Sequence, residues 1–237
     1  MTLLRLDRVT KRYSTGRREY VALRDVSLEV DAAELVTVWG LRRSGRTTLL
    51  RVAAGVDAPD EGAVWFDGRD LASGRDGLLG SEIGYANGHF MPTQGRTVVD
   101  QVAVGLLAHN APIERARTRA YGALERVDAK GCAELDPRLL DPGEVTRVGI
   151  ARAIVAAPRL LLIDDPINGV DLLQRDPLLD LIRSLADEGT AVLMTSGDVV
   201  TIADRMLSID SGELRGEVVP EQAAVVPLRP ARAEPSA

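Results

Sequence analysis

Two apolar runs that each end in a polar loop constrain the fold of this chain more than any other feature. The nearly continuous run Leu35–Trp39 is typical of a strand buried on both faces, and Gly40 ends it. The loop that follows leads into a helical pattern at residues 49–55. A second run, residues 160–163, leads directly into two aspartates. Ligands of open α/β sheets bind at the carboxyl ends of strands, so both loops are candidate parts of one site.

Strand-like and helix-like patterns alternate along the rest of the chain. Strands are expected within residues 4–9, 21–30, 63–66, 83–86 and 191–194, and helices within residues 113–127, 145–156 and 178–185. The stretch after residue 86 is expected to be irregular until the next helical pattern begins. From about Pro220 the chain is rich in proline, alanine and glutamate, which predicts a flexible tail. The whole pattern indicates one α/β domain with a short tail.

Composition excludes several classes of partner and location. A net charge of −6 and 3% aromatic residues argue against binding to nucleic acid, which needs basic surface and stacking platforms. The single cysteine, Cys132, excludes an internal disulfide and fits a reducing compartment. No run approaches the ~18 apolar residues of a membrane span, and the first residues do not resemble a signal peptide. We therefore expect a cytoplasmic protein that reaches a membrane only through a partner.

The loop at residues 40–48 almost matches the phosphate-binding pattern G-x-x-x-x-G-K-S/T. That pattern binds phosphate because backbone N–H groups and a helix N-terminus converge on it, while lysine adds charge and the hydroxyl ligates Mg²⁺. Gly40, Gly45 and Thr47 fit, but Arg46 replaces the lysine. A guanidinium keeps the charge and changes the geometry. Taken alone, the loop is better explained as a glycine turn before a helix, but the paired aspartates about 120 residues later favour nucleotide binding.

With these motifs the sequence resembles the ATP-binding subunits of ABC transporters, and within them the small subunits of lipoprotein and macrolide exporters. The resemblance covers roughly residues 3–218, including a second strand at 22–28 and a hairpin at 60–71. It implies a P-loop NTPase of ABC type with a mixed α/β sheet core, an antiparallel β region and a helical subdomain. The implied domain spans residues 1–219, with the helical subdomain at about 89–156 and the tail at 220–237.

The resemblance implies ATP and Mg²⁺ as ligands and gives roles to individual residues. The residues implied to hold ATP are Gly40, Leu41, Arg42, Arg43, Ser44, Gly45, Arg46, Thr47 and Thr48. Thr47 would ligate Mg²⁺, and Asp164 would reach the ion through water. Tyr13 matches the aromatic residue that stacks on adenine, although local packing at a strand end explains it equally well. Asp171 matches the D-loop aspartate.

Several departures from the family pattern affect the residues that the family uses for ATP hydrolysis. The signature segment, in which the family has Leu-Ser-Gly-Gly-Gln, is Leu140, Asp141, Pro142, Gly143 and Glu144. Asp141 would face a partner subunit's γ-phosphate with a like charge, and Pro142 lacks a backbone donor. Capping of that phosphate is therefore expected to be poor.

The catalytic positions also differ. Gly88 and Gly197 stand at the Q-loop glutamine and the switch histidine, so both side chains are absent. Asp165 replaces the general-base glutamate with a carboxylate that is one methylene shorter. Arg43 replaces a loop glycine, which is unfavourable if the backbone there needs a positive φ. These departures suggest relaxed selection for fast hydrolysis.

The implied partners are an integral membrane permease subunit and a second ATP-binding subunit, in a homodimer or a heterodimer. The protein would then lie peripherally on the inner face of the cytoplasmic membrane. Two functions remain open: an ATP-binding subunit that hydrolyses Mg-ATP slowly, and a catalytically inactive pseudo-ATPase with a structural or regulatory role in a permease complex. A small-molecule kinase is a weaker third hypothesis, because Asp171 and the segment after the signature follow the transporter pattern.

The number of altered positions generates a first prediction. Arg46→Lys alone is expected to recover little ATPase activity, because position 88, Asp165 and Gly197 stay altered. Phosphate release from the purified protein measures this. Substantial recovery would show that the change at position 46 is the whole defect.

Overall fold

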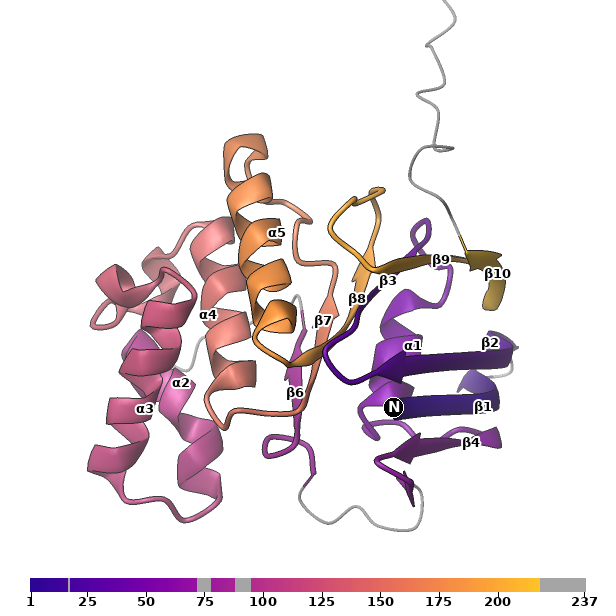
Figure 1. Cartoon of the computed structure of the whole chain (residues 1–237), viewed down its shortest axis with the longest axis horizontal. Helices are drawn as coiled ribbons and strands as arrows, with labels where there is room; N and C mark the ends of the chain where they lie inside the picture. The colour runs from indigo at the N-terminus through magenta and orange to yellow at the C-terminus, as the bar shows by residue number, and fades with distance from the viewer. Residues whose placement is uncertain (17, 72–77, 88–94, 218–237) are drawn as a thin grey trace, which may run out of the picture.

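The computed structural model describes residues 1–16, 18–71, 78–87 and 95–217, which form two sheets and a group of helices (Figure 1). The strands are β1 (Thr2–Thr15), β2 (Arg18–Asp31), β3 (Leu35–Trp39), β4 (Glu61–Phe66), β5 (Arg69–Asp70), β6 (Ile83–Ala86), β7 (Leu160–Asp164), β8 (Ala191–Ser196), β9 (Arg205–Asp210) and β10 (Glu213–Glu217). The α-helices are α1 (Arg46–Ala53), α2 (Val98–Ala108), α3 (Ile113–Arg126), α4 (Pro142–Ile154) and α5 (Leu172–Asp187). Two short 3-10 helices, Lys130–Cys132 and Pro137–Leu139, lie between α3 and α4.

The larger sheet has six strands in the order β10-β9-β3-β8-β7-β6. Its neighbours pair in parallel except β10, which runs antiparallel to β9. Leu161 and Ile163 of β7 pack in the core formed with α2–α5, whereas Leu160 and Leu162 pack in the core on the other face. The strand is therefore buried on both faces, as its apolar run predicts.

Helix α1 joins the two sheets. The antiparallel sheet has the order β2-β1-β4-β5. Leu49 and Leu50 of α1 are fully buried in one core with Leu4 and Leu6 of β1 and with Leu193 of β8. This core fixes the start of α1, and so the end of the loop at residues 40–48, relative to the carboxyl ends of the parallel strands.

The helical group lies on the opposite side of the larger sheet from α1 (Figure 1). Ala116, Ala120 and Leu124 of α3 are buried along one face, which confirms the helical pattern predicted there. Ile113, counted in that pattern, is exposed at the start of the helix. Arg117 does not simply face solvent, because it forms ion pairs with Asp100 of α2 and with Glu134.

Helix α2 corrects the expectation of an irregular stretch after residue 86. Thr97 caps the helix by accepting a hydrogen bond from the backbone N–H of Asp100. Val98, Val99 and Val102 are buried, and their pattern of adjacent valines is as typical of strands as of helices. The sequence did contain one signal for the start of this helix, a threonine that lies three residues before an aspartate and can act as its N-cap. Helix α4 also begins three residues earlier than expected, at Pro142.

The architecture confirms the predicted fold class: a mixed sheet core, an antiparallel β region and a helical subdomain. The predicted tail, residues 220–237, lies outside the described residues, as do residues 89–94 of the predicted helical subdomain. Among the described residues, no helix is long and apolar enough to cross a membrane.

The position of α1 between the sheets generates a stability prediction. Leu50→Ala is expected to lower the free energy of unfolding by about 2–5 kcal/mol, because Leu50 is fully buried between both sheets. Urea denaturation measures the loss. Leu173→Ala is the matched control: its side chain is 88% exposed, and a change within about 0.5 kcal/mol is expected. Equal effects of the two substitutions would contradict the role given to α1.

Candidate functional site

The loop at residues 40–48 runs from the end of β3 to the start of α1, and two glycines are required by its close packing. A Cβ at Gly40 would lie 2.5 Å from the carbonyl oxygen of Ile209. Gly45 has a φ of 109°, and a Cβ there would lie 2.5 Å from the carbonyl oxygen of Ala22. Both glycines therefore let the loop lie directly against neighbouring backbone.

The first turn of α1 carries no side-chain cap and no acidic residue. The backbone N–H groups of a helix N-terminus have no partner within the helix, and they point toward the space before it. Together with the helix dipole they favour an anion in that space. The loop thus keeps the backbone part of a phosphate cradle.

Two arginines of the loop, Arg42 and Arg43, have exposed side chains. Arg43 has a φ of 67°, the left-handed conformation that favours glycine. Arg43 lines a cavity of about 540 Å³ together with Thr47, Thr48 and Tyr20. The sequence predicted an unfavourable backbone at Arg43 if φ were positive there, and the positive φ is present.

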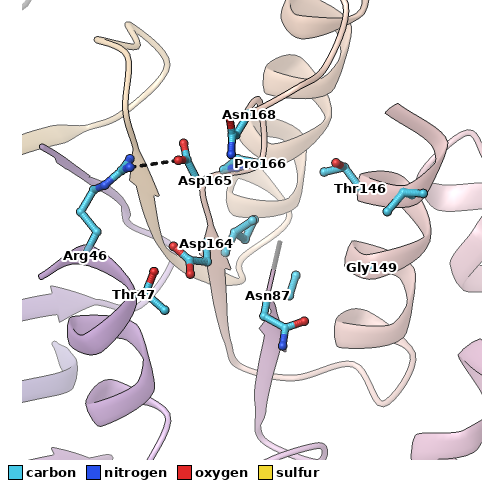
Figure 2. A pocket seen from close by; sticks show the side chains of 12 residues that line it. Arg46, Thr47, Asn87, Thr146, Gly149, Asp164, Asp165, Pro166 and Asn168 are labelled. Carbon is cyan, nitrogen blue, oxygen red and sulfur yellow. Dashed lines mark hydrogen bonds and ion pairs between the residues drawn. The ribbon is translucent and has the colours of Figure 1, made fainter. Parts of the chain in front are cut away.

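Asp164 ends β7 beside the loop. Its Oδ1 accepts a hydrogen bond of 2.7 Å from the hydroxyl of Thr195 in β8. Thr47 and Asp164 line one cavity of about 170 Å³ (Figure 2). Burial, and then the charge of Asp164, raise the pKa of Tyr85 in β6 to about 12. The end of β7 is therefore a site of negative charge that faces the threonine of the loop.

A hydroxyl and a carboxylate are ligands suited to Mg²⁺, which protein sites hold through one or two side chains plus phosphate oxygens and water. No group of three or more His, Cys, Asp or Glu residues suited to a metal occurs in the described part of the chain. The hydroxyl of Thr47 and the carboxylate of Asp164 thus fit two of the ligands of a Mg²⁺ ion whose other ligands are phosphate oxygens and water.

Arg46 turns away from the loop and forms an ion pair with Asp165. Its Nη2 lies 3.0 Å from Oδ2 of Asp165, and the two side chains are 11% and 22% exposed (Figure 2). The other carboxylate oxygen of Asp165 accepts a hydrogen bond of 3.1 Å from the backbone N–H of Gly197. Asp165 has a φ of 50°, and its own N–H bonds to the carbonyl oxygen of Thr195. Strained backbone of this kind occurs at functional sites.

Tyr13 lies in β1 and pairs with Tyr20 of β2, with their ring centroids 5.6 Å apart. Its hydroxyl donates a hydrogen bond of 2.6 Å to Asp57, which Arg51 of α1 also contacts. Burial, followed by the bond to Asp57, raises the pKa of Tyr13 above its usual value. The side chain of Tyr13 is thus linked to Arg51 of α1 through Asp57.

Comparisons with known proteins decide the family. The model of the ABC transporter family matches residues 23–168. The chain is 32% identical to the Bacillus subtilis ABC transporter ATP-binding protein YvrO, over 91% of this chain and 99% of that protein. It is 33% identical to the Escherichia coli cell division ATP-binding protein FtsE, over 91% of this chain and 99% of that protein.

The chain belongs to the ABC transporter ATP-binding family. Among solved structures it resembles the dimeric bacterial ABC transporter cassette MJ0796, with a TM-score of 0.84, 27% identity, and coverage of 91% of this chain and 98% of that chain. A post-hydrolysis state of the same cassette, bound to ADP and Pi, matches equally well at 26% identity. The function as an ABC ATP-binding subunit is confirmed, and the pseudo-ATPase alternative finds no support in these relatives.

Residues 140–144, which are expected at the signature position, lead into the N-terminus of α4, and this helix start is capped by its own side chains. The Asp141 side chain accepts a hydrogen bond of 2.8 Å from the backbone N–H of Glu144, and the Glu144 side chain accepts one of 2.9 Å from the N–H of Asp141. Pro142 occupies the first helical position, where no partner for an N–H is needed. Two backbone N–H groups at this helix N-terminus, those of Asp141 and Glu144, are therefore bonded to side chains of the segment itself.

The structure brings together Arg46, Thr47, Asp164 and Asp165, and Gly197 joins them through Asp165. The signature residues lie on a different helix N-terminus, and Asp171 caps α5 by accepting a hydrogen bond from the N–H of Leu173. Gly88 lies outside the described residues.

Sequence reasoning missed two side chains of the site. Thr195 holds Asp164, and the indole N–H of Trp39 donates a hydrogen bond of 3.1 Å to the carbonyl oxygen of Gly197. Both stand at the carboxyl ends of parallel strands, which is the only sequence signal that pointed to them.

The capping box at α4 generates a prediction. Asp141→Ala is expected to lower the free energy of unfolding by about 0.5–2 kcal/mol through loss of the N-cap. Asp141→Ser, which keeps a capping oxygen and removes the charge, is expected to change it by only a few tenths of a kcal/mol. Thermal or urea denaturation compares the two variants. An equal loss in both would show that the charge, and not the cap, stabilises this helix.

Proposed function

We propose that this subunit binds Mg-ATP at the loop of residues 40–48 and hydrolyses it slowly while serving a membrane permease. The observation that carries the proposal is the meeting of an uncapped helix N-terminus with two carboxylates. The loop before α1 and the end of β7 lie at the same sheet edge, where Thr47 and Asp164 share one cavity. This arrangement suits a phosphate chain that carries a divalent cation.

In this proposal each element has a separate task. The backbone N–H groups at the start of α1 hold phosphate oxygens, and Thr47 and Asp164 hold the ion, Asp164 through water. Mg²⁺ neutralises the charge of the outer phosphates when it is bound. The cavity beside Tyr20, Thr47 and Thr48 has room for the nucleoside. Tyr13 provides an aromatic ring next to Tyr20 for stacking on adenine.

Slow hydrolysis follows from three features of the described residues. Asp165, proposed as the general base, is engaged by Arg46 and by the N–H of Gly197. Gly197 has no side chain that contacts a phosphate. The N-terminus of α4, which would cap the γ-phosphate of a partner subunit, is occupied by its own carboxylates. Binding therefore needs fewer intact groups than hydrolysis does.

We also propose the transporter group, the location, the dimerisation and the domain bounds of this subunit. We place it with the small subunits of lipoprotein and macrolide exporters, attached to an integral membrane permease on the inner face of the cytoplasmic membrane. The dimeric neighbour supports pairing of two ATP-binding subunits, as a homodimer or a heterodimer. The ABC domain is proposed at residues 1–219, with the helical subdomain at about 89–156 and the tail at 220–237.

Titration calorimetry tests the binding. ATP with MgCl₂ is expected to bind with a dissociation constant below about 1 mM. Thr47→Val is expected to weaken the Mg²⁺-dependent part of the affinity at least about threefold, because it removes the hydroxyl ligand. Thr118→Val is the matched control, since its hydroxyl only bonds to the carbonyl oxygen of Glu114 on the exposed face of α3.

Phosphate release in the presence of the permease tests the rate. We expect turnover at least about tenfold below the ~10 s⁻¹ typical of enzymes. No binding at millimolar ATP overturns the proposed function, and turnover near the typical value overturns the proposed slow hydrolysis.

A further inference from the structure

Arg46 and Gly197 fit each other in space, although 150 residues separate them in sequence. The arginine is the first residue of α1, and the glycine follows β8. A Cβ built on Gly197 would lie 3.4 Å from Nη1, 3.6 Å from Nη2 and 3.9 Å from Cζ of Arg46. The guanidinium thus lies in the space that a side chain at position 197 would enter. A Cβ at position 197 would already be in van der Waals contact with the guanidinium.

The environment of Arg46 explains why the guanidinium stays there. A cation at a helix N-terminus is unfavourable with respect to the helix dipole, and a buried cation needs a compensating charge. Asp165 provides it at 3.0 Å, with the arginine side chain 11% exposed. Nη1 of Arg46 is buried and makes no hydrogen bond among the described residues. Nη2 of the arginine is therefore paired, while the N–H groups of Nη1 are left for a further acceptor.

The pairing also engages both carboxylate oxygens of Asp165. Oδ2 contacts Arg46 and Oδ1 accepts from the N–H of Gly197. The Gly197 carbonyl oxygen accepts from the indole N–H of Trp39, which directly precedes the loop glycine Gly40. One chain of contacts thus links the loop, the carboxylate and the turn after β8.

We propose that Arg46 is a positioning residue that holds Asp165 in the nucleotide-free protein and releases it when the terminal phosphate of a triphosphate takes the guanidinium. This rests on the proposed function, since it requires nucleotide phosphates at the loop. Phosphate oxygens accept the two parallel N–H bonds of a guanidinium and are the competitors best matched to a carboxylate. Glycine at position 197 is compatible with the arrangement, because it adds no side chain to the space that the guanidinium occupies.

A diphosphate and a triphosphate are expected to differ in this exchange. The backbone N–H groups before α1 serve phosphates of either nucleotide, whereas only the triphosphate carries a γ-phosphate to compete with Asp165. Asp165 is therefore released only when the γ-phosphate, at which it would act, is present.

Trp39 allows the exchange to be measured directly. The chain contains two tryptophans, so Trp65→Phe leaves Trp39 as the single tryptophan, which is excited selectively at a wavelength that tyrosine does not absorb. In this background we expect Mg²⁺ with the non-hydrolysable analogue AMP-PNP to change the Trp39 emission, and Mg-ADP to change it less than half as much. In Asp165→Asn, the nucleotide-free emission is expected to resemble that of the analogue-bound parent.

Two further variants sharpen the test. Gly197→Leu is expected to displace the guanidinium and to give the same emission as Asp165→Asn without nucleotide. Asp67→Asn is the matched control: it breaks another arginine–aspartate pair, with Arg159 at 2.7 Å, on the turn between β4 and β5, and is expected to behave as the parent. Thermal denaturation of each variant without nucleotide establishes that it is folded before the emission is compared.

Calorimetry on the same variants separates the possible results. Asp165→Asn is expected to bind AMP-PNP at least fivefold more tightly than the parent and ADP within twofold of it, because only the triphosphate has to open the ion pair. Failure of the parent to bind either nucleotide overturns the proposed function and this inference together. Binding by the parent, with the same emission response and the same triphosphate preference in Asp165→Asn, overturns this inference alone.

Discussion

Parallel pairing of β3 with β8 and of β8 with β7 is the constraint on which the rest of the molecule depends. Because these strands run in one direction, their carboxyl ends meet at one edge, and the loops after all three become neighbours. Residues 40–48, Asp164 with Asp165, and Gly197 reach the same place through this register alone. Burial of the strands on both faces, by α1 on one side and by α2–α5 on the other, keeps that register in place.

Two helix N-termini in this fold have opposite electrostatic states. Helix α1 begins without a side-chain cap, so its N–H groups stay available to an anion. Helix α4 begins with a complete capping box, so the N–H groups of Asp141 and Glu144 are bonded and two carboxylates lie at its N-terminus. The presence or absence of side-chain caps thus distinguishes the two termini: the uncapped one is available to phosphate, and the capped one is not. Binding at the loop and capping across a dimer are therefore separable properties in this chain.

Much of the fold was predictable from local patterns, and the exceptions have physical reasons. The central strands and α3 follow from long apolar runs and from clear helical spacing. Helix α2 was missed because its adjacent valines are as typical of strands as of helices, although Thr97 and Asp100 carried a capping signal. Of the site, the loop, Asp164 and Asp165 were found from motifs. The side chains of Thr195 and Trp39 were not found, because their roles depend on the pairing of distant strands.

The sequence by itself determined which chemical groups this ABC cassette has: a phosphate loop with arginine in place of lysine, paired aspartates after a buried strand, and glycine at position 197. Only the tertiary structure decided what the arginine does. Sequence spacing places Arg46 among the phosphate ligands, whereas the folded chain turns its guanidinium toward Asp165. The reason is that a buried cation goes to the nearest available anion, and which anion is nearest is set by the strand pairing and by the space beside Gly197.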